Sequence, residues 1–265
     1  MYPIIDTHCH VYPDKIARKA AEATGRFYAM EPRLFGTLSE LRDCSEQAGI
    51  CHSVINSVAT SPAQVSSINR FIAETAVASG GRMTGLGTLH PDSPNPEKDV
   101  ADALALGLKG IKLHPDIQGF CIDDPRVMRF FEIVAERVPF LLHLGDRRYD
   151  NSNPDRMKRV LESFPHVRFI GAHFAGLSVW DHAARELCGY DNLMVDSSSS
   201  LYALSPKKAV ELIHLFGADR VLFGTDFPLM SPVEEMERFS RLPLTESERE
   251  KILCRNAAAC YEIAI

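Results

Sequence analysis

The sequence predicts an α/β fold, a closed (β/α)8 TIM barrel that forms one domain over residues 1–265. Two observations lead to this expectation. Short apolar runs recur eight times along the chain, and segments with helical periodicity separate them. An open doubly wound sheet is the alternative, but that fold needs a glycine-rich phosphate-binding turn after its first strand. Residues 4–12 contain no glycine, so we favour the closed barrel.

Several of the strand-like runs are apolar throughout, which is typical of parallel strands covered on both faces. Each run is short enough for a strand and is bounded by turn-forming residues. The predicted strands are residues 4–10, 53–58, 83–89, 110–113, 140–144, 167–172, 193–195 and 220–224.

The predicted helices have clear start signals, in which a capping Ser, Asp or Asn stands before a proline at the first helical position. Behind these signals the apolar residues repeat at helical spacing, as one buried face requires. The signals are Ser61-Pro62, Asp124-Pro125, Asn153-Pro154, Ser205-Pro206 and Ser231-Pro232.

The connection after the first strand is unusually long and covers residues 11–51. It contains two helical patterns, Asp14–Thr24 and Leu38–Ala48, with the aromatic residues Phe27, Tyr28 and Phe35 between them. An insertion at this point rises over the C-terminal mouth of a barrel, where active sites of this fold lie. We therefore expect residues 11–51 to form a lid or a pocket wall.

Composition excludes several classes of function. The chain has 35 acidic and 29 basic residues and a formal charge of −6, so it lacks the basic surface of a nucleic-acid-binding protein. No apolar run approaches the roughly 20 residues that span a bilayer. Seven cysteines without a C-x-x-C pair, and no secretory signal pattern, favour a cytoplasmic protein. The expected partner is a small-molecule substrate, and a homodimer is left open.

The first strand ends in Asp6-Thr7-His8-Cys9-His10. Because side chains alternate along a strand, His8 and His10 point to one side and Cys9 to the other. Two neutral imidazoles side by side are the start of a zinc-type site.

Further polar residues stand at the ends of other predicted strands, and a closed barrel brings all these ends into one ring. Several histidines and one carboxylate, with a position left open for water, match the needs of a catalytic divalent metal. These residues are Lys112 and His114 after the fourth strand, His143 after the fifth, His173 after the sixth and Asp226 after the eighth.

With these motifs the chain resembles the amidohydrolase superfamily of metal-dependent barrel enzymes. It is most similar to the amidohydrolase-2 branch, which includes the aminocarboxymuconate-semialdehyde decarboxylase-like enzymes. The motifs that carry the resemblance are D-T-H-C-H (6–10), K-L-H-P (112–115), L-H-L-G (142–145), A-H-F-A-G (172–176) and L-F-G-T-D-F-P (222–228).

The resemblance implies that His8, His10, His143 and Asp226 hold the metal. His173 would activate or position the water, or bind a second metal, and Asp226 would also shuttle a proton. The expected cofactor is one or two divalent ions, zinc by default, with manganese or iron as alternatives.

Lys112 is ambiguous, because related binuclear enzymes carboxylate a lysine at this position to bridge two metals. We favour a free ammonium that binds substrate or pairs with Asp226. Three further residues are candidate substrate ligands: His114, which shares a face with Lys112, Arg147, which could hold a carboxylate, and Trp180, which could line the pocket.

The leading interpretation is a metal-dependent hydrolase that cleaves a C–N or C–O bond of a small molecule, one that could carry a carboxylate. The alternative is a metal-dependent non-oxidative decarboxylase, which uses the same ligands. A barrel that only binds a ligand is a weaker alternative, since a mere binder has no evident use for a water-activating set.

Overall fold

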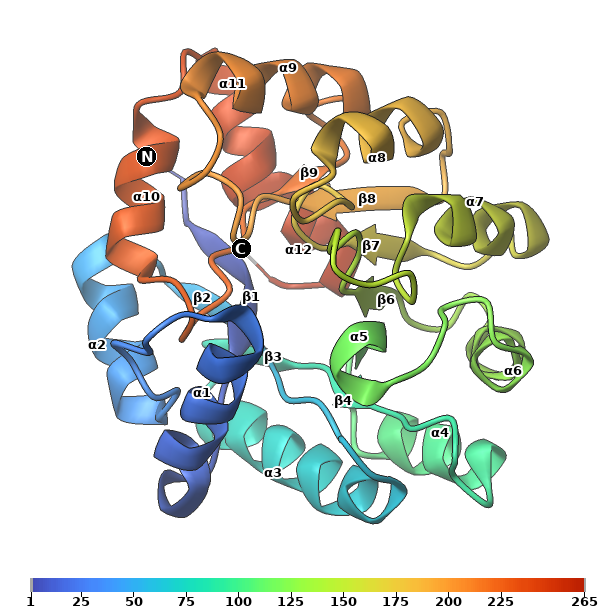
Figure 1. The fold of residues 1–265 in the computed structure, drawn as a ribbon. Helices are drawn as coiled ribbons and strands as arrows, with labels where there is room; N and C mark the ends of the chain where they lie inside the picture. The colour runs from blue at the N-terminus through green and yellow to red at the C-terminus, as the bar shows by residue number, and fades with distance from the viewer. Residues whose placement is uncertain (1, 265) are drawn as a thin grey trace.

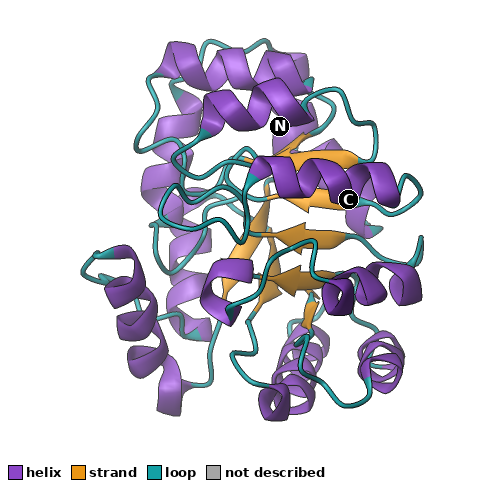
Figure 2. Cartoon of the chain, turned by 45° about the vertical axis from the view of Figure 1, so that its right-hand side comes forward, coloured by secondary structure: helices purple, strands orange, loops and turns teal. Residues whose placement is uncertain are grey.

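The computed structural model describes residues 2–264 and confirms the expected barrel. Parallel strands form the centre, and helices surround them (Figures 1 and 2). The strands are β1 (Ile5–His10), β2 (His52–Asn56), β3 (Met83–Gly85), β4 (Gly87–Thr88), β5 (Ile111–Leu113), β6 (Phe140–Leu142), β7 (Phe169–Gly171), β8 (Leu193–Asp196) and β9 (Val221–Leu222).

The third barrel strand is divided into β3 and β4 at Leu86. Before Leu86 the strand pairs with β2, and after it the strand pairs with β5. Leu86 still donates its N–H to the carbonyl of Ile55 at 2.9 Å, and Gly87 donates to Gly110 at 2.8 Å. The chain therefore changes partner without leaving the barrel wall, so the labelled segments make up eight barrel strands.

The barrel closes between β9 and β1. The Thr7 N–H donates to the carbonyl of Phe223 at 2.9 Å, and the Asp226 N–H donates to the carbonyl of His8 at 2.9 Å. Asp6 strengthens this seam, because its buried carboxylate accepts from the Thr225 hydroxyl at 2.6 Å. The closure places Asp226 directly beside the first strand.

The helices begin where the Ser/Asp/Asn-Pro signals predict. Side chains of Asp124, Asn153 and Ser205 cap three of them, whereas Ser231 makes no side-chain cap. The helices are α1 (Asp14–Tyr28), α2 (Leu38–Ala48), η1 (Pro62–Gln64), α3 (Val65–Ala78), α4 (Pro96–Ala105), α5 (Pro115–Gln118), α6 (Pro125–Val134), α7 (Pro154–Ser163), α8 (Trp180–Leu187), α9 (Pro206–Phe216), α10 (Pro232–Ser240), α11 (Glu246–Glu250), η2 (Lys251–Arg255) and α12 (Asn256–Tyr261).

Helix α1 is longer than the sequence indicates. It continues past Thr24 to Tyr28 and ends at Ala29, which takes a left-handed conformation with φ of 54°. The extension carries Phe27 and Tyr28 on the last helical turn instead of in a loop. Within residues 2–264, none of the helices has both the length and the apolarity to cross a membrane.

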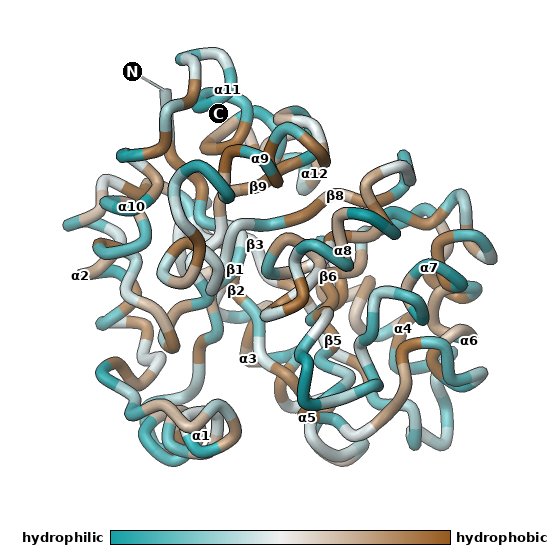
Figure 3. The backbone as a smooth tube through the Cα atoms, turned by 45° about the horizontal axis from the view of Figure 1, so that its top comes forward, coloured by the Kyte–Doolittle hydropathy of each residue, from teal (hydrophilic) through white to brown (hydrophobic). Residues whose placement is uncertain are grey.

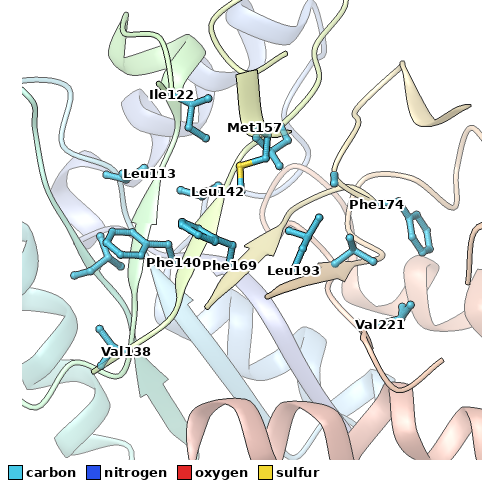
Figure 4. Packing of buried hydrophobic residues seen from close by; sticks show 14 of the residues in the cluster. Leu113, Ile122, Val138, Phe140, Leu142, Met157, Phe169, Phe174, Leu193 and Val221 are labelled. Atoms are coloured by element: carbon cyan, nitrogen blue, oxygen red, sulfur yellow. The ribbon is translucent and has the colours of Figure 1, made fainter. Parts of the chain in front are cut away.

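The core has two layers. Between the strands and the helices, the outward-facing residues Phe140 and Phe169 (Figure 4) pack against Phe131 of α6, whose ring centroid lies 4.8 Å from that of Phe140 and 5.1 Å from that of Phe169. In Figure 3 the tube is mainly hydrophobic along β6 and β8 and alternates in polarity along the surrounding helices. Inside the barrel a smaller apolar cluster includes Ile5, Val54, Leu86, Leu141, Ile170 and Leu222.

The inward face becomes polar towards the C-terminal ends of the strands. Because inward positions recur every second residue, Val54 is followed by Asn56 and Leu141 by His143. Met194 is followed in the same way by Asp196. The apolar cluster thus closes the floor of the barrel, and the residues above it form a buried polar layer.

Candidate metal centre

Three side chains converge at the mouth of the barrel. The Nε2 atoms of His8 and His10 lie 3.2 Å apart, and each lies 3.4 Å from Oδ1 of Asp226. Cys9, between the two histidines, packs outward into the core, as strand alternation predicts. The structure therefore brings His8, His10 and Asp226 into one group, with all ligand atoms within 4.8 Å of one another.

Asp196 determines which nitrogen of His8 faces this group. Its Oδ2 lies 2.8 Å from Nδ1 of His8, and an ionised carboxylate only accepts hydrogen bonds. Nδ1 therefore carries the proton, and the lone pair of Nε2 points to the site. Asp196 also accepts from the backbone N–H groups of His173 and Ser198 at 2.9 and 3.0 Å. Sequence reasoning missed Asp196, although it ends β8 as the other candidates end their strands.

His143 and His173 form a second pair. Nδ1 of His173 lies 3.0 Å from the carbonyl oxygen of Ser198, so Nδ1 is the donor and Nε2 carries the lone pair. That Nε2 lies 3.0 Å from Nδ1 of His143. Nε2 of His143 in turn lies 3.3 Å from Oδ2 of Asp116. Because Nε2 of His173 is an acceptor, Nδ1 of His143 carries the proton and donates to it, and Nε2 of His143 is left without a hydrogen-bond partner among residues 2–264.

His143 belongs to a different group of ligand atoms from the one the resemblance implies. It clusters with His114 and Asp116, and the imidazoles of His114 and His143 stack with centroids 3.8 Å apart. The expected set of His8, His10, His143 and Asp226 is thus divided between two neighbouring groups.

The protonation states suit a cation. Burial lowers the pKa of His10 to about 4, against the opposing effect of Asp226, and lowers that of His173 to about 3. Burial alone would raise the pKa of Asp226, but His8, His10 and His173 around it hold it well below its usual value. His10 and His173 are therefore neutral and Asp226 is ionised near pH 7, the forms that bind a metal.

Unfavourable backbone conformations hold two of these residues in place. His173, Phe174 and Ala175 follow one another with φ of 61°, 51° and 56°, and Asp226 has φ of 70°. Non-glycine residues seldom take such values, and strain of this kind clusters at functional sites. The hydroxyl of Ser199 donates to Oδ2 of Asp226 at 2.5 Å and fixes that carboxylate further.

Lys112 lies inside the same polar layer and is 1% exposed. Its Nζ lies 3.0 Å from Nε2 of His8. From the sequence we expected Lys112 to pair with Asp226 or to bind the substrate. Burial lowers the pKa of Lys112 to about 8, although Asp226 and Asp196 oppose that shift.

Helix α1 reaches this site through Tyr28. The Tyr28 hydroxyl lies 2.8 Å from Nε2 of His114, and its ring centroid lies 6.3 Å from that of His143. Phe27 stacks on Tyr149 at 5.2 Å. Arg148 binds Asp146, donates to the carbonyl of Phe27 at 2.6 Å and lies over the rings of Phe27, Tyr28 and Tyr149.

The other candidate substrate ligands are placed differently. Arg147 is exposed, and its guanidinium donates to the carbonyl of Ser178 at 3.4 Å. Trp180 donates its indole N–H to the carbonyl of His173 at 3.1 Å and to the Ser200 hydroxyl at 3.2 Å. Substrate binding by Lys112, His114, Arg147 and Trp180 stays a prediction.

The donor set fits a divalent cation. Two imidazole nitrogens and a carboxylate oxygen are ligands that suit zinc, manganese or iron. A barrel whose buried polar ring offers such a set at the C-terminal strand ends has the architecture of a metal-dependent barrel enzyme.

Comparison with known families gives the particular family. Residues 5–263 match the family described as amidohydrolase, the amidohydrolase-2 group. The chain therefore belongs to this family. A comparison with curated proteins finds no match.

Solved structures agree with this fold over the whole chain. A TIM-barrel protein from Bordetella bronchiseptica is 22% identical, with a TM-score of 0.78 and coverage of 98% of both chains. The 5-carboxyvanillate decarboxylase of Sphingomonas paucimobilis is 17% identical, with a TM-score of 0.77 and full coverage of both chains (100%). A dihydroxybenzoic acid decarboxylase from Polaromonas sp. JS666, with bound manganese and the inhibitor 2-nitroresorcinol, is 18% identical, with a TM-score of 0.73 and coverage of 99% of this chain and 97% of that chain. At these identities the likeness establishes the fold.

Proposed function

We propose that the protein is a metal-dependent, non-oxidative decarboxylase of small aromatic carboxylic acids. The observation that carries the proposal is the match over nearly the full chain to barrels described as decarboxylases of 5-carboxyvanillate and dihydroxybenzoic acid. The sequence favoured a hydrolase, which would use the same metal ligands. These structural neighbours support the alternative, a decarboxylase, better than the hydrolase.

His8, His10 and Asp226 would hold the ion, since their ligand atoms converge. When bound, a divalent ion draws electron density from the substrate oxygens and favours loss of the carboxyl group. Manganese in a related decarboxylase structure supports a divalent cation without choosing between manganese and zinc.

Asp226 is the residue we assign to proton transfer. It is ionised in the free enzyme, so it first takes a proton from a substrate hydroxyl or from water. Asp226 then delivers this proton to the ring carbon that bears the carboxylate. The bond between that carbon and the carboxyl carbon breaks, its electron pair restores the aromatic ring, and CO2 leaves. Solvent returns a proton to the oxygen from which the first one was taken.

The test is incubation of metal-loaded protein with 2,6-dihydroxybenzoate and 5-carboxyvanillate, following both CO2 and the decarboxylated phenol. We expect equal amounts of the two products. A parallel panel of esters, lactones and amides tests the hydrolase interpretation, for which a new carboxylate appears without CO2. Tight binding of an acid with neither product would point to a binding barrel.

A further inference from the structure

The side-chain amide of Asn56 is buried and unsatisfied in the described part of the chain. It is the last residue of β2 and is 0% exposed, yet among residues 2–264 neither Nδ2 nor Oδ1 has a hydrogen-bond partner. Buried polar groups are nearly always hydrogen-bonded, and leaving one unsatisfied destabilises a fold. A fully unsatisfied side-chain amide therefore needs an explanation.

The position of Asn56 in the barrel supplies an explanation for its unsatisfied amide. Val54, two residues earlier, belongs to the apolar cluster inside the barrel, so the Asn56 side chain lies on the same inward face one layer higher. Its partner in the β1–β2 register is His10, a member of the proposed metal group. Asn56 thus belongs to the polar layer at the barrel mouth.

A second buried asparagine shows what a purely structural amide looks like in this fold. Asn69, on α3, is 2% exposed and has both side-chain atoms satisfied by one residue. Its Nδ2 donates to the carbonyl of Thr88 at 3.1 Å, and its Oδ1 accepts from the Thr88 N–H at 2.8 Å. Asn69 ties a helix to a strand, and Asn56 has no comparable contact.

We propose that Asn56 is a substrate-binding residue that recognises a hydroxyl group beside a carboxylate. An amide presents one donor and one acceptor side by side. Its complement is a group that offers an acceptor and a donor at the same spacing. In an acid with an adjacent hydroxyl, a carboxylate oxygen accepts from Nδ2 and the hydroxyl donates to Oδ1. This inference deepens the proposed function and rests on it for the class of substrate.

The test compares binding of 2-hydroxybenzoate and benzoate to metal-loaded protein by titration calorimetry. Wild-type protein should bind 2-hydroxybenzoate at least about tenfold more tightly, as expected for hydrogen bonds to a buried site. Asn56→Leu, which keeps the approximate shape and removes both polar atoms, should bind the two acids equally. Asn56→Asp, which loses the donor and adds a negative charge, should bind both acids more weakly than wild-type protein.

Thermal unfolding gives a readout that needs no substrate. Asn56→Leu should unfold at or above the wild-type temperature, because it removes an unsatisfied amide. The matched control Asn69→Leu should unfold at least about 2 °C lower, since it breaks two backbone bonds.

The inference is overturned if Asn56→Leu loses stability as Asn69→Leu does or fails to fold. It is also overturned if wild-type protein does not prefer 2-hydroxybenzoate over benzoate, or if Asn56→Leu keeps that preference. The second outcome is expected if Asn56 binds only an ordered water. Binding does not require turnover. If Asn56→Leu no longer distinguishes the two acids, but wild-type protein releases CO2 from none of the acids tested, the role of Asn56 in binding is supported and the proposed decarboxylase activity is rejected.

Discussion

The ammonium nitrogen of Lys112 lies 3.0 Å from Nε2 of His8, although the two residues belong to strands β5 and β1. Asp196 binds the opposite nitrogen of that imidazole, so Nε2 is the acceptor and Lys112 is the donor. A cation bound to Nε2 of His8 competes with this hydrogen bond. Lys112 must then turn away, lose its proton or become carboxylated.

We expect the protein to hold about one divalent ion per chain through His8, His10 and Asp226. Elemental analysis of unchelated protein measures this occupancy, and His8→Ala should abolish it because it removes a converging nitrogen. His214→Ala is the matched control, since His214 is exposed on α9, lies 2.8 Å from Glu248 and belongs to none of the possible metal-binding groups of the described residues. A metal-free protein with full activity would contradict both the site and the proposed function.

The variant Asp226→Asn separates metal binding from proton transfer. An amide oxygen still coordinates a cation, but it has no basic lone pair near pH 7. General acid–base participation contributes about 10²–10⁴-fold, so turnover should fall at least about a hundredfold while much of the metal stays bound. Occupancy and rate have to be measured on the same sample. A near-normal rate at full occupancy would move the proton transfer to His173.

Arg148 should hold α1 over the mouth of the barrel. Its guanidinium bonds to Asp146 and to the carbonyl of Phe27, with the rings of three aromatic residues around it. Arg148→Ala removes these contacts and should make the segment around α1 more sensitive to limited proteolysis. Arg147→Ala is the matched control, because Arg147 contacts the Ser178 loop instead. If Arg147→Ala alone weakens substrate binding, Arg147 is the substrate ligand that the sequence predicts.

Glu235 should make stability depend on pH. It is 0% exposed, its Oε1 accepts from Arg238 at 2.6 Å, and its Oε2 has no hydrogen-bond partner within residues 2–264. Burial, with smaller contributions from Asp226 and Asp6, raises its pKa from 4.5 to about 7 in spite of Arg238. Its contribution to stability is therefore complete below pH 4.5 and is lost as the pH rises through 7.

Urea unfolding at pH 4.5 and pH 8 tests this effect. Glu235→Gln should match wild-type protein at pH 4.5 and exceed it by about 3 kcal/mol at pH 8. Glu234→Gln is the control of opposite sign, because bonds to Arg33 and Arg238 lower the pKa of Glu234. If Glu235→Gln is no more stable than wild-type protein at pH 8, the ionised carboxylate of Glu235 does not destabilise the fold and the prediction is wrong.

Local sequence determined the framework of this protein. Capping residues before prolines located the helices, and apolar runs located the strands, because both signals act within a few residues of the chain. Alternation placed His8 and His10 on one side and Cys9 on the other. The position of polar residues at strand ends singled out His143, His173 and Asp226, since every parallel strand of a barrel ends at the same mouth.

Only the tertiary structure decided how these residues meet. The division of His8, His10 and Asp226 from His143 and His114 depends on distances across the barrel, which no local pattern contains. Asp196 and Asn56 could be recognised only from the tertiary structure. Asp196 orients an imidazole from another strand, and the side chain of Asn56 has no hydrogen-bond partner in the described part of the chain. A sequence specifies which face each side chain takes, whereas hydrogen-bond partners and orphaned groups arise only when the strands close on one another.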